Sequence, residues 1–143
     1  LDPALIEAAN EDYPGPVWMV GDLSELDLTG AFDVAEGDRV VFDVIVCAGN
    51  VMAFLDPATR RAVLQRLGAH LAEGGRIVLG FGSGRDYDFE EYFADVAGVG
   101  LVEDLRLSTW DMRPFTESSD FLVSVLRSPA EPPPHSSDDG LVR

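Results

Sequence analysis

The sequence predicts an α/β domain whose sheet is mostly parallel and ends in an antiparallel pair of strands. Three observations lead to this prediction. Asp-Pro pairs, which are typical of helix starts, begin at Asp2 and Asp56, each ahead of a segment with helical periodicity. Continuous apolar runs at 40–48 and 76–80 are typical of parallel strands. Apolar residues alternate in two runs within 101–125, which favours antiparallel pairing because no helix separates them.

The first forty residues predict a helix, a short strand and an acidic loop. Asp2 and Pro3 read as the cap and first residue of a helix that ends near residue 13, so the sequence starts where a helix starts, as a fragment would. The run 17–20 is rich in strand-forming residues and stops at a Gly-Asp pair. Segment 24–39 is acidic and predicts a solvated loop.

The middle of the chain predicts a strand, a helix and a second strand. Run 40–48 is expected to be buried on both faces, and the helix beginning at Asp56 is expected to end at the glycine pair 74–75. Strand 76–80 follows. The helix presents an apolar stripe on one face and arginines on the other: Val63, Leu64, Leu67 and Leu71 against Arg60, Arg61 and Arg66.

The last part predicts a glycine-rich loop, a third helix and the antiparallel pair. Loop 81–85 precedes a helix marked by Phe89 and Phe93 and capped by Gly98 or Gly100. Residues 128–143 are rich in Pro, Ser and Asp and predict a disordered tail behind a domain that spans 1–127.

Composition limits the possible partners. The 143 residues carry 26 acidic side chains against ten arginines and no lysine, a formal charge of −16. Nucleic acid binding is disfavoured because it needs a basic surface. No apolar run is long enough to span a bilayer, and no basic flank with a hydrophobic leader opens the sequence, so we expect a cytoplasmic protein without a membrane partner. Cys47 has no second cysteine to pair with, and no set of residues has the spacing of a metal site.

Ligands of parallel sheets lie beyond the carboxyl ends of the strands, which singles out three places in this sequence. Asp22 could accept a hydrogen bond from an adenine amine while the next backbone N–H donates to the ring, or it could simply cap a turn. The turn at Gly49 and Asn50 leaves room for close approach of a ligand, or serves only as a turn. Loop 81–85 is the third place.

The glycines of that loop leave a further alternative open. Gly80, Gly82 and Gly84 lie between a strand and a helix, as in dinucleotide-binding loops, but their spacing differs from the G-x-G-x-x-G pattern. A nucleotide-dependent oxidoreductase would use this loop for phosphate binding. A flexible loop at the border of a site is the other interpretation.

Four segments, taken in order, resemble the later motifs of class I S-adenosylmethionine-dependent methyltransferases. These are Leu-Asp-Pro-Ala-Leu-Ile at 1–6, Val-Trp-Met-Val-Gly-Asp-Leu at 17–23, Phe-Asp-Val-Ile-Val-Cys-Ala-Gly-Asn-Val at 42–51, and Leu-Ala-Glu-Gly-Gly-Arg-Ile-Val at 71–78. The likeness is strongest to small bacterial methyltransferase-domain proteins. It implies a Rossmann-like sheet and the cofactor S-adenosylmethionine.

The resemblance also implies roles for individual residues. Asp22 would receive the adenine amine and the Leu23 backbone would meet the ring, while Leu1 would touch adenine. The residues implied at the cofactor are Leu1, Asp22, Leu23, Ala48, Gly49, Asn50 and Val51. Positions near strand ends, without a family motif, suggest five residues for the substrate face: Phe54, Phe81, Arg85, Trp110 and Arg113. The expected reaction is methyl transfer to a small-molecule acceptor, with no catalytic base assigned.

The sequence departs from the family in one large respect. The glycine-rich motif and the ribose-binding acid would both precede Leu1, so the N-terminal strands and first helix of the family fold are expected to be missing. A non-catalytic interaction module that kept the sheet without the cofactor pocket is therefore the alternative hypothesis.

Overall fold

The computed structural model of the chain describes residues 2–129 and contains one four-stranded sheet. The strands lie in the order β1-β2-β4-β3, with β1 and β2 parallel and the other two pairs antiparallel. The elements are α1 (Pro3–Asp12), η1 (Leu23–Glu25), β1 (Phe42–Cys47), η2 (Val51–Phe54), α2 (Arg60–Ala69), β2 (Leu71–Gly82), α3 (Phe89–Gly98), β3 (Val102–Leu107) and β4 (Phe121–Arg127). The predicted α/β class and the antiparallel end of the sheet are confirmed.

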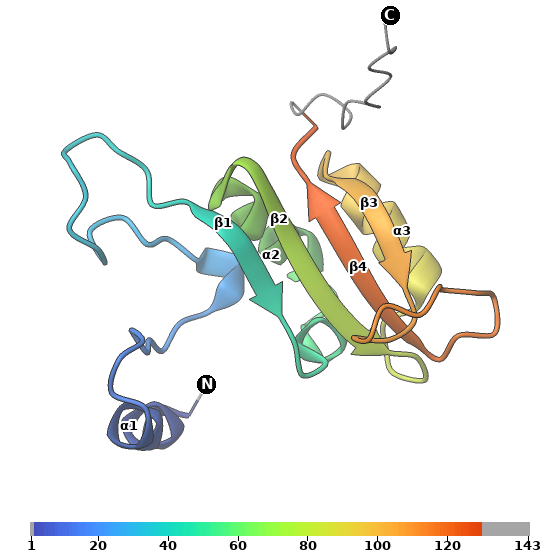
Figure 1. Cartoon of the computed structure of the whole chain (residues 1–143), viewed down its shortest axis with the longest axis horizontal. Helices are drawn as coiled ribbons and strands as arrows, with labels where there is room; N and C mark the ends of the chain where they lie inside the picture. Colours follow the sequence, from blue (N-terminus) through green and yellow to red (C-terminus); the bar gives the residue numbers. More distant parts are fainter. Residues whose placement is uncertain (1, 130–143) are drawn as a thin grey trace, which may run out of the picture.

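Helices α2 and α3 cover the same face of the sheet, as Figure 1 shows, and the core lies between them and the strands. Apolar side chains of α2 pack against alternate residues of β2, among them Ile77, Leu79 and Phe81, which are fully buried. On the opposite face of β1, Val44 and Val46 are more than half exposed. The prediction that this strand is buried on both faces is therefore wrong in this structure, because no element covers its second face among residues 2–129.

Segment 2–41 packs loosely compared with the sheet. Helix α1 begins where predicted, with the Asp2 carboxylate accepting from the Ala4 N–H at 3.0 Å, but it contains no buried residue and stands apart from the sheet in Figure 1. Residues 17–20 form no strand, which corrects the prediction. A strand needs a neighbour to receive its hydrogen bonds, and none of the described strands runs beside this segment.

Several contacts fasten this segment to the rest of the domain, among them an edge-to-face ring contact of Phe32 with Phe42 of β1. Leu23 and Leu26, at η1, pack against the core. The Leu28 N–H donates to Nε2 of the buried His70 at 3.3 Å. The Arg39 guanidinium donates to the Ala69 carbonyl at the end of α2.

The boundaries of helix α2 and strand β2 differ from those that the sequence predicted. Asp56 caps a turn, accepting from the Ala58 N–H at 2.9 Å, and α2 begins only at Arg60. The helix ends at Ala69, and the glycine pair 74–75 lies inside β2 instead of stopping the helix. Gly74 has a φ of 74° where the pairing with β1 shifts register, and this turn-like backbone explains why glycine occupies a strand interior.

The third helix and the antiparallel pair follow the prediction. Helix α3 ends at Gly98, and Gly100, with a φ of 81°, lies just beyond its end. Strand β3 pairs with β4, which in turn pairs with β2. The predicted disordered tail at 128–143 lies outside the described residues except for its first two. No helix within 2–129 combines the length and apolarity needed to cross a membrane.

Candidate functional site

Four loops converge at one end of the sheet. Strands β1, β2 and β3 all end there, because β3 and β2 are both antiparallel to β4. The segments that leave these ends are 48–59, 83–88 and 108–120, and the η1 segment approaches β1 from outside (Figure 1). The candidate residues that follow β1, β2 and β3 therefore lie at the carboxyl ends of these strands, the usual ligand position in parallel sheets, whereas Asp22 and Leu23 follow no strand.

Asp22 caps η1 and retains an acceptor oxygen. Its Oδ1 accepts from the Ser24 hydroxyl at 2.7 Å and from the Ser24 N–H at 2.8 Å. These two hydrogen bonds lower the pKa of the exposed Asp22 carboxyl, and the bond from the Ser24 hydroxyl has the larger effect. Asp22 is therefore ionised at neutral pH. Among the hydrogen bonds of residues 2–129, none engages Oδ2. The capping role is thus present, and it leaves one carboxylate oxygen for a ligand.

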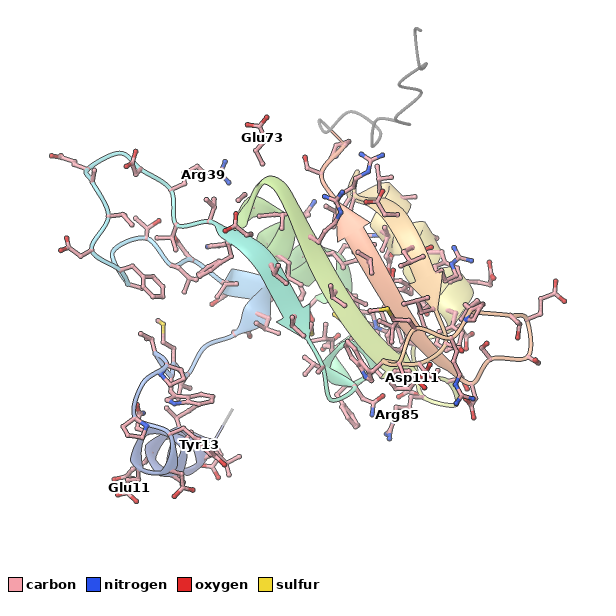
Figure 2. All side chains as sticks on the ribbon, in the orientation of Figure 1. Glu11, Tyr13, Arg39, Glu73, Arg85 and Asp111 are labelled. Carbon is pink, nitrogen blue, oxygen red and sulfur yellow. The ribbon has the colours of Figure 1, made fainter. Side chains whose placement is uncertain are left out.

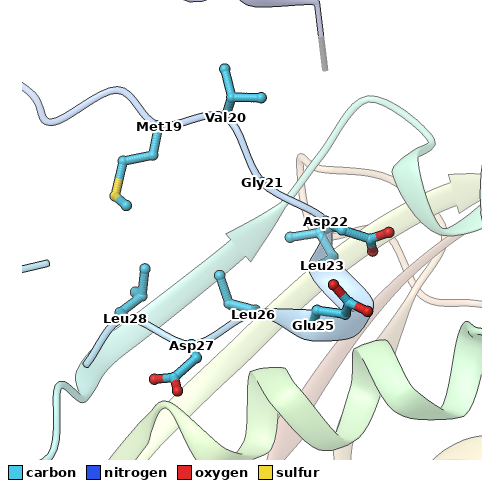
Figure 3. A pocket seen from close by; sticks show the side chains of 9 residues that line it. All are labelled: Met19, Val20, Gly21, Asp22, Leu23, Glu25, Leu26, Asp27 and Leu28. Carbon is cyan, nitrogen blue, oxygen red and sulfur yellow. The ribbon is translucent and has the colours of Figure 1, made fainter. Parts of the chain in front are cut away.

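Two adjoining pockets meet at the segment 20–23. One, of about 280 Å³, is bounded by residues 19–23 and 25–28. In Figure 3 the Met19 side chain points toward Leu26 and Leu28, and the carboxylates of Asp22 and Glu25 lie at the opposite end of the segment. The second, of about 550 Å³, lies between residues 20–23 and the side chains of Val51 and Leu55.

The second pocket has the chemistry of an adenine site. Val51 and Leu55 supply apolar surface, while Asp22 supplies a charged acceptor. Leu23 begins η1, and a helix's first N–H has no partner inside the helix, so it can donate to a ligand. The volume of this second pocket is within the range of small-molecule sites. The residues present therefore fit the adenine end of a nucleoside cofactor.

The turn after β1 ties the two parallel strands together. Gly49 and Asn50 both have left-handed backbone conformations, with φ of 77° and 62°, and Asn is the residue that tolerates this region best after Gly. The Asn50 side-chain oxygen accepts from the Gly82 N–H at 2.8 Å, which joins the ends of β1 and β2. A Cβ added at Gly49 would have nothing within 4 Å, so the backbone there is open to a ligand.

Phe54 and Arg85 meet at this end of the sheet. Phe54 is the last residue of η2 and is 67% exposed, although Met52 and Ala53 beside it are buried. The Arg85 guanidinium lies over the Phe54 ring, 4.6 Å from its centroid. In Figure 2 the Arg85 side chain points away from the sheet at the end where β2 stops. These two predicted substrate-face residues are in contact with each other.

The glycine loop has little capacity to hold a phosphate. The Gly82 N–H donates to Asn50, and the Ser83 N–H donates to the Asp120 carbonyl at 2.7 Å. Gly80 is covered by Trp110, whose ring would lie 2.6 Å from a Cβ added at this glycine. A phosphate-binding loop needs such backbone donors free, so the geometry disfavours the dinucleotide interpretation.

The remaining substrate-face predictions have different outcomes. Phe81 is fully buried and stacks on Tyr87 with ring centroids 5.5 Å apart, so its placement on the substrate face is corrected: it belongs to the core. Trp110 packs on Gly80 and is 47% exposed. Arg113 is exposed and forms an ion pair with Asp111 at 3.3 Å. Leu1 lies outside the described residues.

A buried polar cluster behind the site was missed from the sequence. Arg60 is 2% exposed, donates to the Asp86 carbonyl at 2.6 Å and lies over the Tyr87 ring at 4.0 Å. The Tyr87 hydroxyl donates to Asp95 at 2.8 Å, which also accepts from Arg61 at 2.6 Å. The helical spacing contained the signal, since position 60 shares a face with the buried residues three, four and seven positions later.

Comparisons with known proteins agree on the fold. No family model and no curated protein matches the sequence. Among solved structures, a TehB-like S-adenosylmethionine-dependent methyltransferase from Corynebacterium glutamicum is 38% identical, with a TM-score of 0.79 over 90% of this chain. The chain spans 65% of that protein's length.

Two more distant structures have the same fold. An S-adenosylmethionine-dependent methyltransferase from Clostridium acetobutylicum is 11% identical, with a TM-score of 0.75 over 90% of this chain and 72% of its own. An amino pentose methyltransferase from Micromonospora echinaspora, solved with S-adenosylmethionine bound, is 20% identical, with a TM-score of 0.59 over 87% of this chain and 71% of its own. The fold of this chain is that of the class I S-adenosylmethionine-dependent methyltransferases.

Proposed function

We propose that this chain, with its class I methyltransferase fold, binds S-adenosylmethionine and belongs to an enzyme that methylates a small molecule. The observation that carries the proposal is the 38% identity to a methyltransferase of this fold over 90% of the chain. The pocket beside Asp22 supports it independently, because its apolar walls and its charged acceptor suit adenine.

The adenine end of the cofactor would be held from two sides. Asp22 would accept from the exocyclic amine through Oδ2, and the Leu23 N–H would donate to a ring nitrogen. Val51 and Leu55 would pack on the ring. Ala48, Gly49 and Asn50 would run beside the remainder of the cofactor, where the lack of bulky side chains permits close approach.

The bound cofactor supplies an electrophilic methyl group on a sulfonium. The contribution of this chain is to place an acceptor in line with that group and to keep water away. Such positioning can account for about 7–11 kcal/mol of a reaction barrier. Phe54, Arg85 and Trp110 are the residues that would orient the acceptor, and a neutral or anionic nucleophile needs no base from the protein.

The acceptor is expected to be small and not a nucleic acid. The chain carries 26 acidic residues against ten arginines, so its overall field repels a phosphate backbone.

The proposal is tested by titrating S-adenosylhomocysteine into the folded chain in a calorimeter, with two matched variants. In Asp22→Asn the amide can still cap η1 but has lost the charge and one acceptor oxygen, so affinity should fall roughly ten- to hundredfold. Asp56→Asn makes the same change in a similar capping turn that lines neither pocket, and should leave affinity unchanged.

Two results would contradict this proposal. If the chain is folded by circular dichroism and S-adenosylhomocysteine does not bind, the proposal that this chain binds the cofactor is contradicted. If the cofactor product binds and both variants match the wild type, Asp22 is only a helix cap.

A further inference from the structure

Arg85 differs from most arginines of this acidic chain. Ion pairs with carboxylates hold Arg60, Arg61, Arg76, Arg106, Arg113 and Arg127. Within residues 2–129, Arg85 forms no ion pair, and its guanidinium lies against an apolar ring. In a chain of charge −16 this is a conspicuous positive group at the carboxyl ends of the strands.

The stack on Phe54 fixes the guanidinium without using its donors. A cation over an aromatic face is attracted by the ring itself, so the five N–H groups of arginine remain available at the edge of the plane. A planar guanidinium held in this way matches the two oxygens of a carboxylate or phosphate. Phe54 would at the same time offer apolar surface to the part of the ligand next to the anion.

The loop that carries Arg85 is anchored on both sides. Ahead of Arg85, the Gly82 and Ser83 N–H groups donate to Asn50 and Asp120. Behind it, the Asp86 carbonyl accepts from the buried Arg60 at 2.6 Å, and Arg60 also pairs with Glu91 at 3.2 Å. These bonds reduce the entropy that would be lost when a ligand immobilises the loop.

Phe54 is also anchored close to the proposed cofactor pocket. It shares the short helix η2 with Val51, whose side chain lines that pocket, and with the buried Met52. An anion held over Phe54 would therefore belong to a molecule lying beside the cofactor.

We propose that the methyl acceptor carries a carboxylate or phosphate group, and that Arg85, held over Phe54, binds this group. The inference rests on the proposed function, since it assigns the chemical class of that enzyme's acceptor. Arg60 and Asn50 act as positioning residues for the loop, and Arg85 makes the contact.

The experiment uses three aromatic probes of similar shape: benzoate, phenyl phosphate and the neutral benzamide. Each is titrated into the full chain saturated with S-adenosylhomocysteine, with binding followed by NMR. We expect an anionic probe to bind about tenfold more tightly than benzamide. The tighter of the two anions identifies carboxylate or phosphate as the recognised group.

Three variants locate the binding. Arg85→Gln should lose the preference for the anion, and Arg85→Lys should recover part of it because the charge returns without the planar pair of donors. Arg66→Gln removes the same charge from the far end of α2, a position outside both the cofactor pocket and the acceptor face, and should behave as the wild type. S-adenosylhomocysteine affinity is measured for every variant.

The outcomes separate this inference from the proposed function. Equal binding of benzamide and the anions, an unchanged preference in Arg85→Gln, or an equal loss in Arg66→Gln would overturn the assignment of Arg85 while cofactor binding stands. Absence of S-adenosylhomocysteine binding from a folded chain would overturn the proposed function. Arg85 could then no longer be assigned to binding a methyl acceptor.

Discussion

The sheet region 42–127 and the preceding region 2–41 are built on different principles. The former buries an apolar face of its sheet under α2 and α3, with a cluster of aromatic rings at its centre. The latter has a well-capped helix without a single buried residue, and exposes Val17 and Val20. Helix α1 thus rests on local signals such as its Asp2 cap, which leave a helix of ten residues only marginally stable without packing, whereas the strands lie where a partner and a core are present.

The two regions nevertheless share the candidate site. Asp22 and Leu23 come from the loosely packed region, and Val51 and Leu55 come from the packed one. The pocket between them therefore depends on how η1 is held, through Leu23 and Leu26 against the core and through Leu28 against His70. Ligand binding should tighten this junction, since it would bridge both sides.

The largest expected effect comes from the aromatic centre of the core. Phe81 is fully buried against Tyr87, Phe89 and Tyr92, so Phe81→Ala should lower the free energy of unfolding by about 3–5 kcal/mol. The matched change in the other region, Leu5→Ala, removes a side chain that is 61% exposed and should cost less than about 0.5 kcal/mol. Urea unfolding measures both, and similar costs would break the distinction between the regions.

A smaller effect concerns the buried phenols of the sheet region. Burial raises the pKa of Tyr87, and the hydrogen bond to Asp95 raises it further by a smaller amount. Burial also raises the pKa of Tyr92. The unfolded chain ionises its tyrosines near pH 10 while the folded chain keeps these two protonated. The free energy of unfolding should therefore be insensitive to these groups below about pH 10 and fall as the pH rises above it.

Tyr87→Phe sharpens this prediction. The variant should lose about 1 kcal/mol at pH 8, because Asp95 loses one donor but keeps Arg61. Above pH 10 its stability should decline less steeply than that of the wild type, as measured by urea unfolding between pH 8 and 11. Parallel curves for the two proteins would show that Tyr87 does not contribute to the alkaline loss.

Sequence patterns predicted the elements whose cause is local or periodic. The capping at Asp2, the apolar stripe of α2 and the alternation in β4 each follow from spacing along the chain. The run 17–20 has strand-forming residues as well, but strand formation depends on a neighbour that a spacing pattern does not reveal.

The sequence also predicted only part of the candidate site, because spacing along the chain does not reveal contacts between distant residues. The strand-end rule placed Asn50 and Arg85 at one end of the sheet, where the structure has them. It also placed Phe81 there, although the alternation along β2 turns that side chain into the core with Leu79. Arg60 was expected on the exposed face of α2, but the helical spacing places it on the same face as the buried residues 63, 64 and 67. There it meets Asp86 and Glu91, which come from distant parts of the chain.

The central claim is that the junction between the two regions is a cofactor site, and amide hydrogen exchange with and without S-adenosylhomocysteine tests it most directly. We predict slower exchange in residues 19–28 and 48–55 together, because the ligand would contact both sides of the pocket. Unchanged exchange in both segments, or slowing confined to the loop 83–88, would contradict the claim.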